Sequence, residues 1–191
     1  MGKSRLEAFS DGVIAIIITI MVLELKVPEG QDFAAIYPLI PVFTSYLLSF
    51  IFVGIYWNNH HHMIHVVKEV SGVVLWANLH LLFWLSLVPF ATAWMGANHF
   101  AAQPVALYGF ILLMAGVAFS ILSWTLIRHQ GSNPTLARAI GRNEKGKISM
   151  ALYALAVPIA FFSRFISLGL YITVAFMWLI PDRRIEKVLK E

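Results

Sequence analysis

Long apolar segments separated by short polar ones are the feature that most constrains how this chain can fold. A helix needs about 20 mostly apolar residues to cross the hydrocarbon core of a bilayer. Four segments have that length: 5–26, 38–64, 72–97 and 104–128. The composition agrees, because 59% of the 191 residues are hydrophobic and 13% are charged, whereas a soluble domain is about half apolar and a quarter charged. The sequence therefore predicts an all-α integral membrane protein.

The apolar stretch 148–181 is too long for one spanning helix and short for two. We divide it near Ser163–Arg164, which gives two short helices over 147–163 and 165–181 joined by a tight turn. All 191 residues then form a single domain of six transmembrane helices.

The positive charges favour six spans with both termini in the cytoplasm. If the N-terminus is cytoplasmic, twelve lysines and arginines lie on that side and two, Lys26 and Arg164, lie on the other. Such an excess is typical of cytoplasmic loops. The net charge of +4 is therefore interpreted as a topology signal, and no nucleic-acid partner is expected. The twelve residues are Lys3, Arg5, Lys68, Arg128, Arg138, Arg142, Lys145, Lys147, Arg183, Arg184, Lys187 and Lys190.

Two local patterns mark where the first helix starts and where the longest loop lies. Ser4 and Glu7 have the spacing of a capping box, which predicts a helix that begins there and ends near Leu25. The polar segment 129–147 is predicted to be a cytoplasmic loop, with a short surface helix over 135–142.

The first apolar segment carries an aliphatic stripe. Ile16, Ile20 and Leu23 follow i, i+4, i+7 spacing and share one helix face, with Thr19 beside them. Asp11 lies about 140° to 180° round the helix from Ile16 and Ile20. We therefore expect Asp11 to face neighbouring helices and the stripe to face elsewhere.

Several polar residues fall at a similar depth when the predicted helices are laid antiparallel. Buried polar groups in lipid need partners, so we expect this belt to satisfy Ser10 and Asp11. Arg5 is a poor partner for Asp11 six residues along the same helix, which favours a cross-helix ion pair or network. The belt consists of Asp11, Asn58, Asn59, Asn78, His80 and Trp124.

The histidines near the end of the second segment allow a metal site. His61 and His65 have the i, i+4 spacing that can bind zinc, and Glu69 is the only carboxylate close in sequence. We interpret these histidines and the neighbouring Trp57 as interface residues and predict no metal. The sequence has no cysteine and shows no nucleophilic triad, phosphate loop, zinc-protease motif or paired catalytic carboxylates. No enzymatic activity is expected.

The segment Arg5-x-x-x-Phe9-Ser10-Asp11 resembles the signature of one membrane protein family. It is similar to the motif that opens each repeat of the transmembrane protein 175 family, which are potassium channels of lysosomes with shorter bacterial relatives. The surrounding Gly12-Val13 and Leu23-Glu24-Leu25 also resemble the family pattern. The lysosomal members are similar to two six-helix units in tandem, and this chain resembles one such unit over essentially its whole length.

The resemblance implies a homotetramer that conducts potassium passively through a pore lined by the first helix. Carried over, Ile16, Ile20 and Leu23 form the constriction and Thr19 a polar layer. A ring of aliphatic side chains around the pore offers no ligand to replace the water around a potassium ion. Modest selectivity for potassium over sodium and a gate that closes by dewetting are therefore expected. A prokaryotic plasma membrane, potassium as the permeant ion and no cofactor complete the expectation. The implied structural network comprises Arg5, Phe9, Ser10, Asp11, Asn58, Asn78, His80 and Trp124.

Two other classes of protein remain open. A proton-coupled secondary transporter, or a proton-permeable channel, would use Asp11 and His80, because intramembrane ionisable residues mark proton relays. Carriers often contain inverted repeats and broken helices; neither is detected, although Pro89 and Pro158 can break helices. A redox or metal membrane protein would use the histidines.

Overall fold

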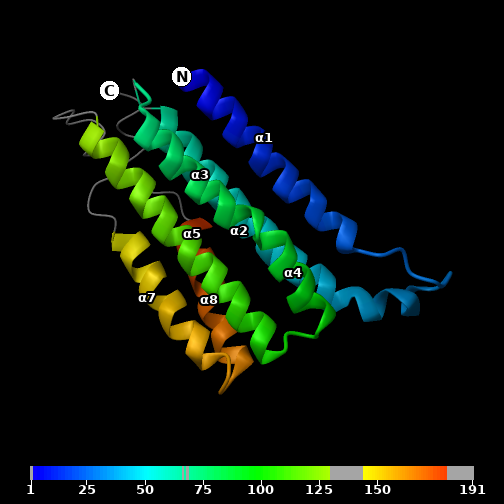
Figure 1. Ribbon diagram of the computed structural model, residues 1–191. Coiled ribbons are helices and arrows are strands. Elements are labelled where there is room, and N and C mark those ends of the chain that lie inside the picture. The colour runs from blue at the N-terminus through cyan, green and yellow to red at the C-terminus, as the bar shows by residue number, and fades with distance from the viewer. Residues whose placement is uncertain (1, 66, 68, 130–143, 180–191) are drawn as a thin grey trace.

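Helices are the only regular secondary structure in the part of the chain that the structure describes, in agreement with the predicted all-α class (Figure 1). The computed structural model describes residues 2–65, 67, 69–129 and 144–179. The elements in chain order are α1 (Lys3–Met21), the 3-10 turn η1 (Val22–Glu24), the 3-10 segment η2 (Phe33–Leu39), α2 (Ile40–His65), α3 (Gly72–Ser86), α4 (Val88–Ala97), α5 (Ala102–His129), α7 (Glu144–Ile159) and α8 (Arg164–Leu179).

Among the described residues, four helical segments are long and apolar enough to cross a membrane, and they overlap the first four predicted spans. They are Lys3–Glu24, Phe33–His65, Gly72–Ala97 and Ala102–His129. The chain is therefore an integral membrane protein. α7 and α8 have 16 residues each, or about 24 Å at 1.5 Å per residue. α7 continues through Pro158 and ends at Ile159, and α8 begins at Arg164. The count of six spans stays a prediction.

The third span is broken, contrary to our expectation of a continuous helix. α3 ends at Ser86, and Leu87 separates it from α4, which has Pro89 in its first turn. Proline has no N–H to continue the helical ladder, and its ring clashes with the carbonyl group four residues earlier. The chain tightens there instead, with the Leu87 N–H bonded to the Trp84 carbonyl at 3.3 Å. A break near mid-span is thus present even though no repeat accompanies it in the sequence.

The start of α1 also differs from the prediction. The helix begins at Lys3, with Gly2 as its extended N-cap and no side-chain cap bond. Ser4 therefore lies inside the first turn and cannot cap it. The Gly2 carbonyl accepts from the backbone N–H of Arg5 at 3.1 Å and of Leu6 at 3.4 Å.

α5 forms the centre of the bundle and α1 lies at its edge (Figure 1). α5 packs against α3, α4, α7 and α8 and buries side chains along its whole length. α1 packs against α2, α3 and α4. One side of α1 is therefore left uncovered by the single chain.

Two predicted features lie outside the described residues. They are the surface helix over 135–142 and most of the basic residues of the loop and tail, including Arg138, Arg183 and Lys187.

The contact between α2 and α4 is close enough to require glycine at position 96. A Cβ added to Gly96 would lie 2.8 Å from the Val42 Cα and 2.5 Å from the Ser45 Oγ. We expect Gly96→Ala to lower the free energy of unfolding by about 1–3 kcal/mol, because overpacking moves backbone. The measurement is thermal unfolding of the purified protein in detergent.

Gly54→Ala is the matched control for this substitution. A Cβ added to Gly54 meets nothing within 4 Å, and alanine favours a helix interior over glycine by about 1 kcal/mol. Its melting temperature should be unchanged or slightly higher. Equal losses in both variants would contradict the close α2–α4 contact.

Candidate functional site

α1 has an inward face of buried residues and an outward face of exposed ones. Its buried residues, Leu6, Ser10, Ile14, Ile17 and Met21, recur at intervals of three and four. On the other side, Ile16 is 60% exposed, Ile20 41% and Leu23, in η1, 76%. Thr19 is also exposed. The structure therefore places the predicted aliphatic stripe on the uncovered side of the edge helix.

A chain of buried hydrogen bonds ties α1 to α3 and α2. The Asn78 amide donates to the Ser10 Oγ at 2.9 Å, and the Ser10 hydroxyl donates to the Leu6 carbonyl at 2.9 Å. The Asn78 Oδ1 lies 2.8 Å from the His60 Nε2. Ser10 and Asn78 are fully buried and His60 is 1% exposed. These bonds satisfy polar groups where water is excluded.

The bonding pattern sets the tautomer of His60. Because the Asn78 amide nitrogen donates to Ser10, its Oδ1 can only accept, so the His60 Nε2 carries the proton that it donates. The buried His60 Nδ1 has no hydrogen-bond partner among the described residues. In the neutral ring this atom is an unpaired acceptor. An unmade bond of this kind destabilises a buried site.

Asp11 faces α2, as its position on the helix predicted, but its partner is one that the sequence interpretation missed. The Trp57 Nε1 donates to the Asp11 carboxylate at 3.0 Å. The sequence predicts Trp57 to be an interface residue, yet Trp57 and His60 are the α2 residues that bond to the signature segment and to Asn78.

The other members of the predicted belt do not join this network. Asn58 is exposed, and the described residues offer it no hydrogen bond. Asn59 donates to the Ile55 carbonyl at 2.8 Å within α2. The His80 Nε2 accepts from the Trp84 indole at 3.0 Å. Trp124 is 59% exposed, with the Arg128 guanidinium 5.1 Å from its ring centroid. Depth alone therefore selected residues that lie on other helix faces.

Arg5 and Phe9 lie on the outward side of α1. Phe9 is 50% exposed and Arg5 is exposed. Within the described ranges neither Arg5 nor Asp11 forms an ion pair, and the cross-helix partner of Asp11 is Trp57.

The histidine pair at the end of α2 meets a carboxylate from α1. His61 and His65 lie beside Glu7, and one ligand atom from each falls within 4.8 Å of the other two. Glu69, the carboxylate that the sequence suggested, is not part of this group. Glu7 comes from another helix, so the residues near the histidines in the sequence give no indication of it.

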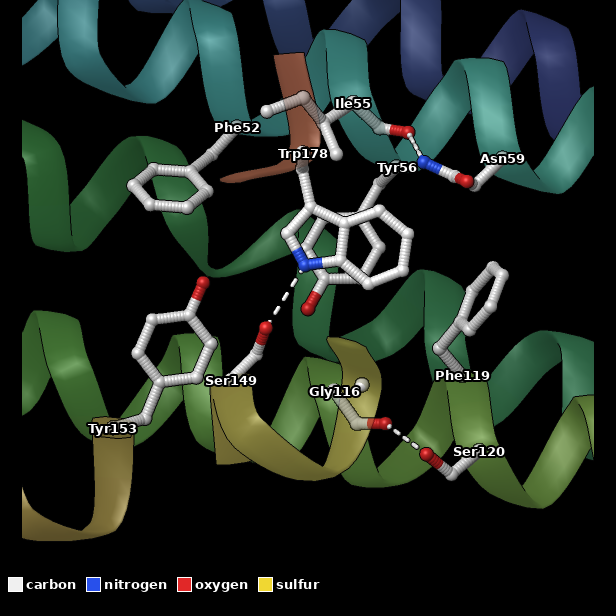
Figure 2. Close-up of a pocket in the computed structure, with 11 residues that line it drawn as sticks. Phe52, Ile55, Tyr56, Asn59, Gly116, Phe119, Ser120, Ser149, Tyr153 and Trp178 are labelled. Carbon is white, nitrogen blue, oxygen red and sulfur yellow. Dashed lines mark hydrogen bonds between the residues drawn. The ribbon is translucent and has the colours of Figure 1, made fainter. Parts of the chain in front are cut away.

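A separate pocket lies between α2, α5, α7 and α8 (Figure 2). Figure 2 shows the Trp178 indole turned toward Ser149, which it meets at 2.8 Å. The hydroxyl of Ser120 donates to the Gly116 carbonyl at 2.9 Å. Because these polar groups bond to one another or to the backbone, the walls of the pocket are mostly apolar. No residue of α1 lines it. The lining consists of Phe52, Ile55, Tyr56, Asn59, Gly116, Phe119, Ser120, Gly146, Ser149, Tyr153 and Trp178.

The membrane-length helices and the hydrogen-bonded polar groups between them define a polytopic membrane protein. Its edge helix, α1, is bonded to the bundle on one face and exposed on the other. The family model described as endosomal/lysosomal potassium channel TMEM175 matches residues 5–89, and a relative named potassium channel is 58% identical over the whole chain. More specifically, then, the chain belongs to the TMEM175 family. The range that the family model matches covers α1 to the start of α4 and contains the whole hydrogen-bonded network.

Individual relatives extend the similarity to the full chain. A protein named potassium channel from Chryseobacterium sp. is 58% identical over 191 residues, which is 100% of both chains. The crystal structure of a lysosomal potassium-selective channel TMEM175 homologue from Chamaesiphon minutus aligns with a TM-score of 0.80 and 28% identity, over 93% of this chain and 96% of that one. The human endosomal/lysosomal proton channel TMEM175 is 31% identical over 85% of this chain and 36% of its own length.

The Ser10–Asn78–His60 chain of bonds yields a test of stability. Asn78→Ala removes the donor to Ser10 and the acceptor for His60, and leaves both buried groups short of a partner. We expect the free energy of unfolding to fall by about 1–3 kcal/mol for the unpaired groups alone, measured by thermal unfolding in detergent. Asn58→Ala removes a similar side chain from an exposed position and should cost less than about 0.5 kcal/mol. Equal losses of unfolding free energy in the two variants would show that the network does not stabilise the protein.

Proposed function

We propose that this chain is a subunit of a passive potassium channel whose ion pathway is lined by α1. The observation that carries the proposal is the uncovered aliphatic stripe of Ile16, Ile20 and Leu23 on a helix whose opposite face is fixed by hydrogen bonds. The names of the Chryseobacterium and Chamaesiphon relatives support potassium as the permeant ion.

The position of α1 requires several copies to form a pore. A helix at the edge of one bundle cannot enclose a path, whereas copies related by rotation place the same face around a common axis. The family resemblance favours four copies. Each would contribute Ile16, Ile20 and Leu23 to three successive rings about the axis.

The side chains of the stripe explain how such a pore conducts and closes. Rings of aliphatic side chains offer an ion no ligands, so the constriction closes by dewetting. Selectivity then depends on the hydration of the ion and on the width of the pore. The Thr19 hydroxyl lies 3.0 Å from the carbonyl oxygens of Ala15 and Ile16. Because its proton is used on the backbone, its lone pairs are free to face the lumen. We propose Thr19 as a weak polar layer and modest selectivity of potassium over sodium.

The proposed setting is the plasma membrane of a prokaryote, with both termini in the cytoplasm. The excess of basic residues on the N-terminal side supports this orientation. The signature end of α1 then lies at the cytoplasmic face, and η1 lies at the opposite face.

Proton permeation is the second candidate, favoured by the name of the human relative. A relay that passes directly from Asp11 to His80 has little support, because Asp11 bonds to Trp57 and His80 to Trp84. The same pore is the simpler path for protons. Flux driven by a proton gradient, compared between the native chain and His80→Gln, separates the two routes.

The constriction is tested by Ile16→Asn. An amide at the narrow point should hydrate it and raise potassium and sodium flux together, severalfold, with a lower potassium preference. Flux is measured from liposomes that contain the purified protein under potassium and then sodium gradients.

Ile166→Asn is the matched control, because Ile166 of α8 is 58% exposed and Ile16 is 60% exposed. Flux through this variant should equal that of the native chain. If Ile16→Asn leaves conductance and selectivity unchanged, Ile16 does not line the narrow point. If the native chain shows no flux without a proton gradient, the carrier interpretation replaces the channel.

A further inference from the structure

α1 and α2 meet along a seam of three contacts spaced one helical turn apart. The Lys3 ammonium donates to the His65 carbonyl, Glu7 lies beside His61, and Asp11 accepts from Trp57. From one contact to the next, the residue number rises by four on α1 and falls by four on α2. The two helices therefore run antiparallel in a fixed register, and this register brings Glu7 and His61 together.

The middle of this seam contains three metal-ligating side chains. The Glu7 Oε1 lies 3.4 Å from the His61 Nδ1. Two ligands of a tetrahedral zinc ion, each at about 2.0–2.1 Å, lie about 3.3 Å apart. The carboxylate and the first imidazole thus already have the separation that a shared metal ion demands.

His65 completes the set from the next turn of α2. Its ring centroid is 6.0 Å from that of His61, with 30° between the ring planes, and all three ligand atoms lie within 4.8 Å of one another. His65 is exposed, so rotation about its side-chain bonds is free to close the remaining distance. An ion pair between His61 and Glu7 alone would give no role to His65.

The chemistry of the three groups selects a borderline transition-metal ion. Two imidazoles and one carboxylate suit zinc, and they leave the fourth tetrahedral position for water. The His61 and Glu7 side chains are 40% and 24% exposed, so an ion can enter from the aqueous side. The negative charge of Glu7, with Asp11 one turn further along α1, compensates part of the charge of the ion.

We propose that Glu7, His61 and His65 form a zinc-binding site that clamps the N-terminal end of α1 to the C-terminal end of α2. The clamp lies one turn beyond the Asp11–Trp57 bond and cross-links the same two helices. Zinc binding therefore reduces the freedom of α1 to move relative to α2. The part of this inference that concerns conductance rests on the proposed function, whereas the binding site does not.

The binding test uses the full chain, purified without a histidine tag and stripped of metal with a chelator. Zinc alone is titrated by calorimetry or against a fluorescent chelator. We expect about one zinc ion per chain, and at least about a tenfold loss of affinity in Glu7→Gln, His61→Gln and His65→Gln, as for loss of a ligand or its close support. His65 is exposed, so His65→Gln should fold normally.

His62→Gln is the matched control. His62 belongs to the same histidine run and its ring centroid lies 5.7 Å from that of His61, yet it is outside the group of three ligand atoms. Its affinity should equal that of the native chain. Absence of zinc binding in the native chain, or equal affinities in His62→Gln and His65→Gln, would overturn the site.

A second measurement separates this inference from the proposed function. Zinc should raise the melting temperature of the native chain and leave that of His65→Gln unchanged, because only the native chain gains the clamp. In liposomes, zinc should change potassium flux in the native chain and not in His65→Gln. Zinc binding without any potassium flux would remove the proposed function and keep the site. Potassium flux without zinc binding would remove the zinc site and keep the proposed function.

Discussion

The structure depends on one requirement, which is that the polar groups of α1 find partners inside the membrane region. Unpaired polar groups in hydrocarbon are costly, and α1 carries Ser10 and Asp11 at adjacent positions just before its long apolar run. Asn78 satisfies the first and Trp57 the second. With both bonds made, the rotation of α1 about its axis is fixed. At 100° per residue, Ile16 then lies about 120° to 140° from both polar positions, on the side that the single chain leaves open.

The two halves of α1 are held by different forces. From Lys3 to Asp11 the helix makes directional hydrogen bonds and a charged contact with α2 and α3. Beyond Asp11 it is held by the buried side chains of Ile14, Ile17 and Met21, with the Met21 sulfur 4.0 Å from the Thr92 hydroxyl. Hydrophobic contact is not directional. The half that carries the stripe can therefore adjust its packing at lower cost than the half that carries the signature.

Helical periodicity places Ile16 and Ile20 opposite Asp11, so the sequence predicts that the stripe faces away from the helices that Asp11 contacts. The partners of α1 depend on the relative rotation and register of two helices. Asn58 and Trp57 lie at nearly the same depth, yet only Trp57 faces α1. Glu7 and His61 are 54 positions apart and meet only because of the α1–α2 register. The break at Leu87 is marked by Pro89, but resemblance of this segment to the family's third helix favours a single continuous helix, and the missing N–H of proline overrides that expectation.

The exposed face of α8 offers a comparison with that of α1. α8 exposes the bulky side chains of Phe165 and Phe176, together with Gly169 and Thr173. α1 exposes small or polar residues, Gly12, Ala15 and Thr19, between its aliphatic side chains. Small residues let membrane helices approach closely, and both threonine hydroxyls bond to carbonyl groups of their own helix. Composition therefore does not distinguish the two faces, and what sets α1 apart is the set of hydrogen bonds that fixes its opposite face.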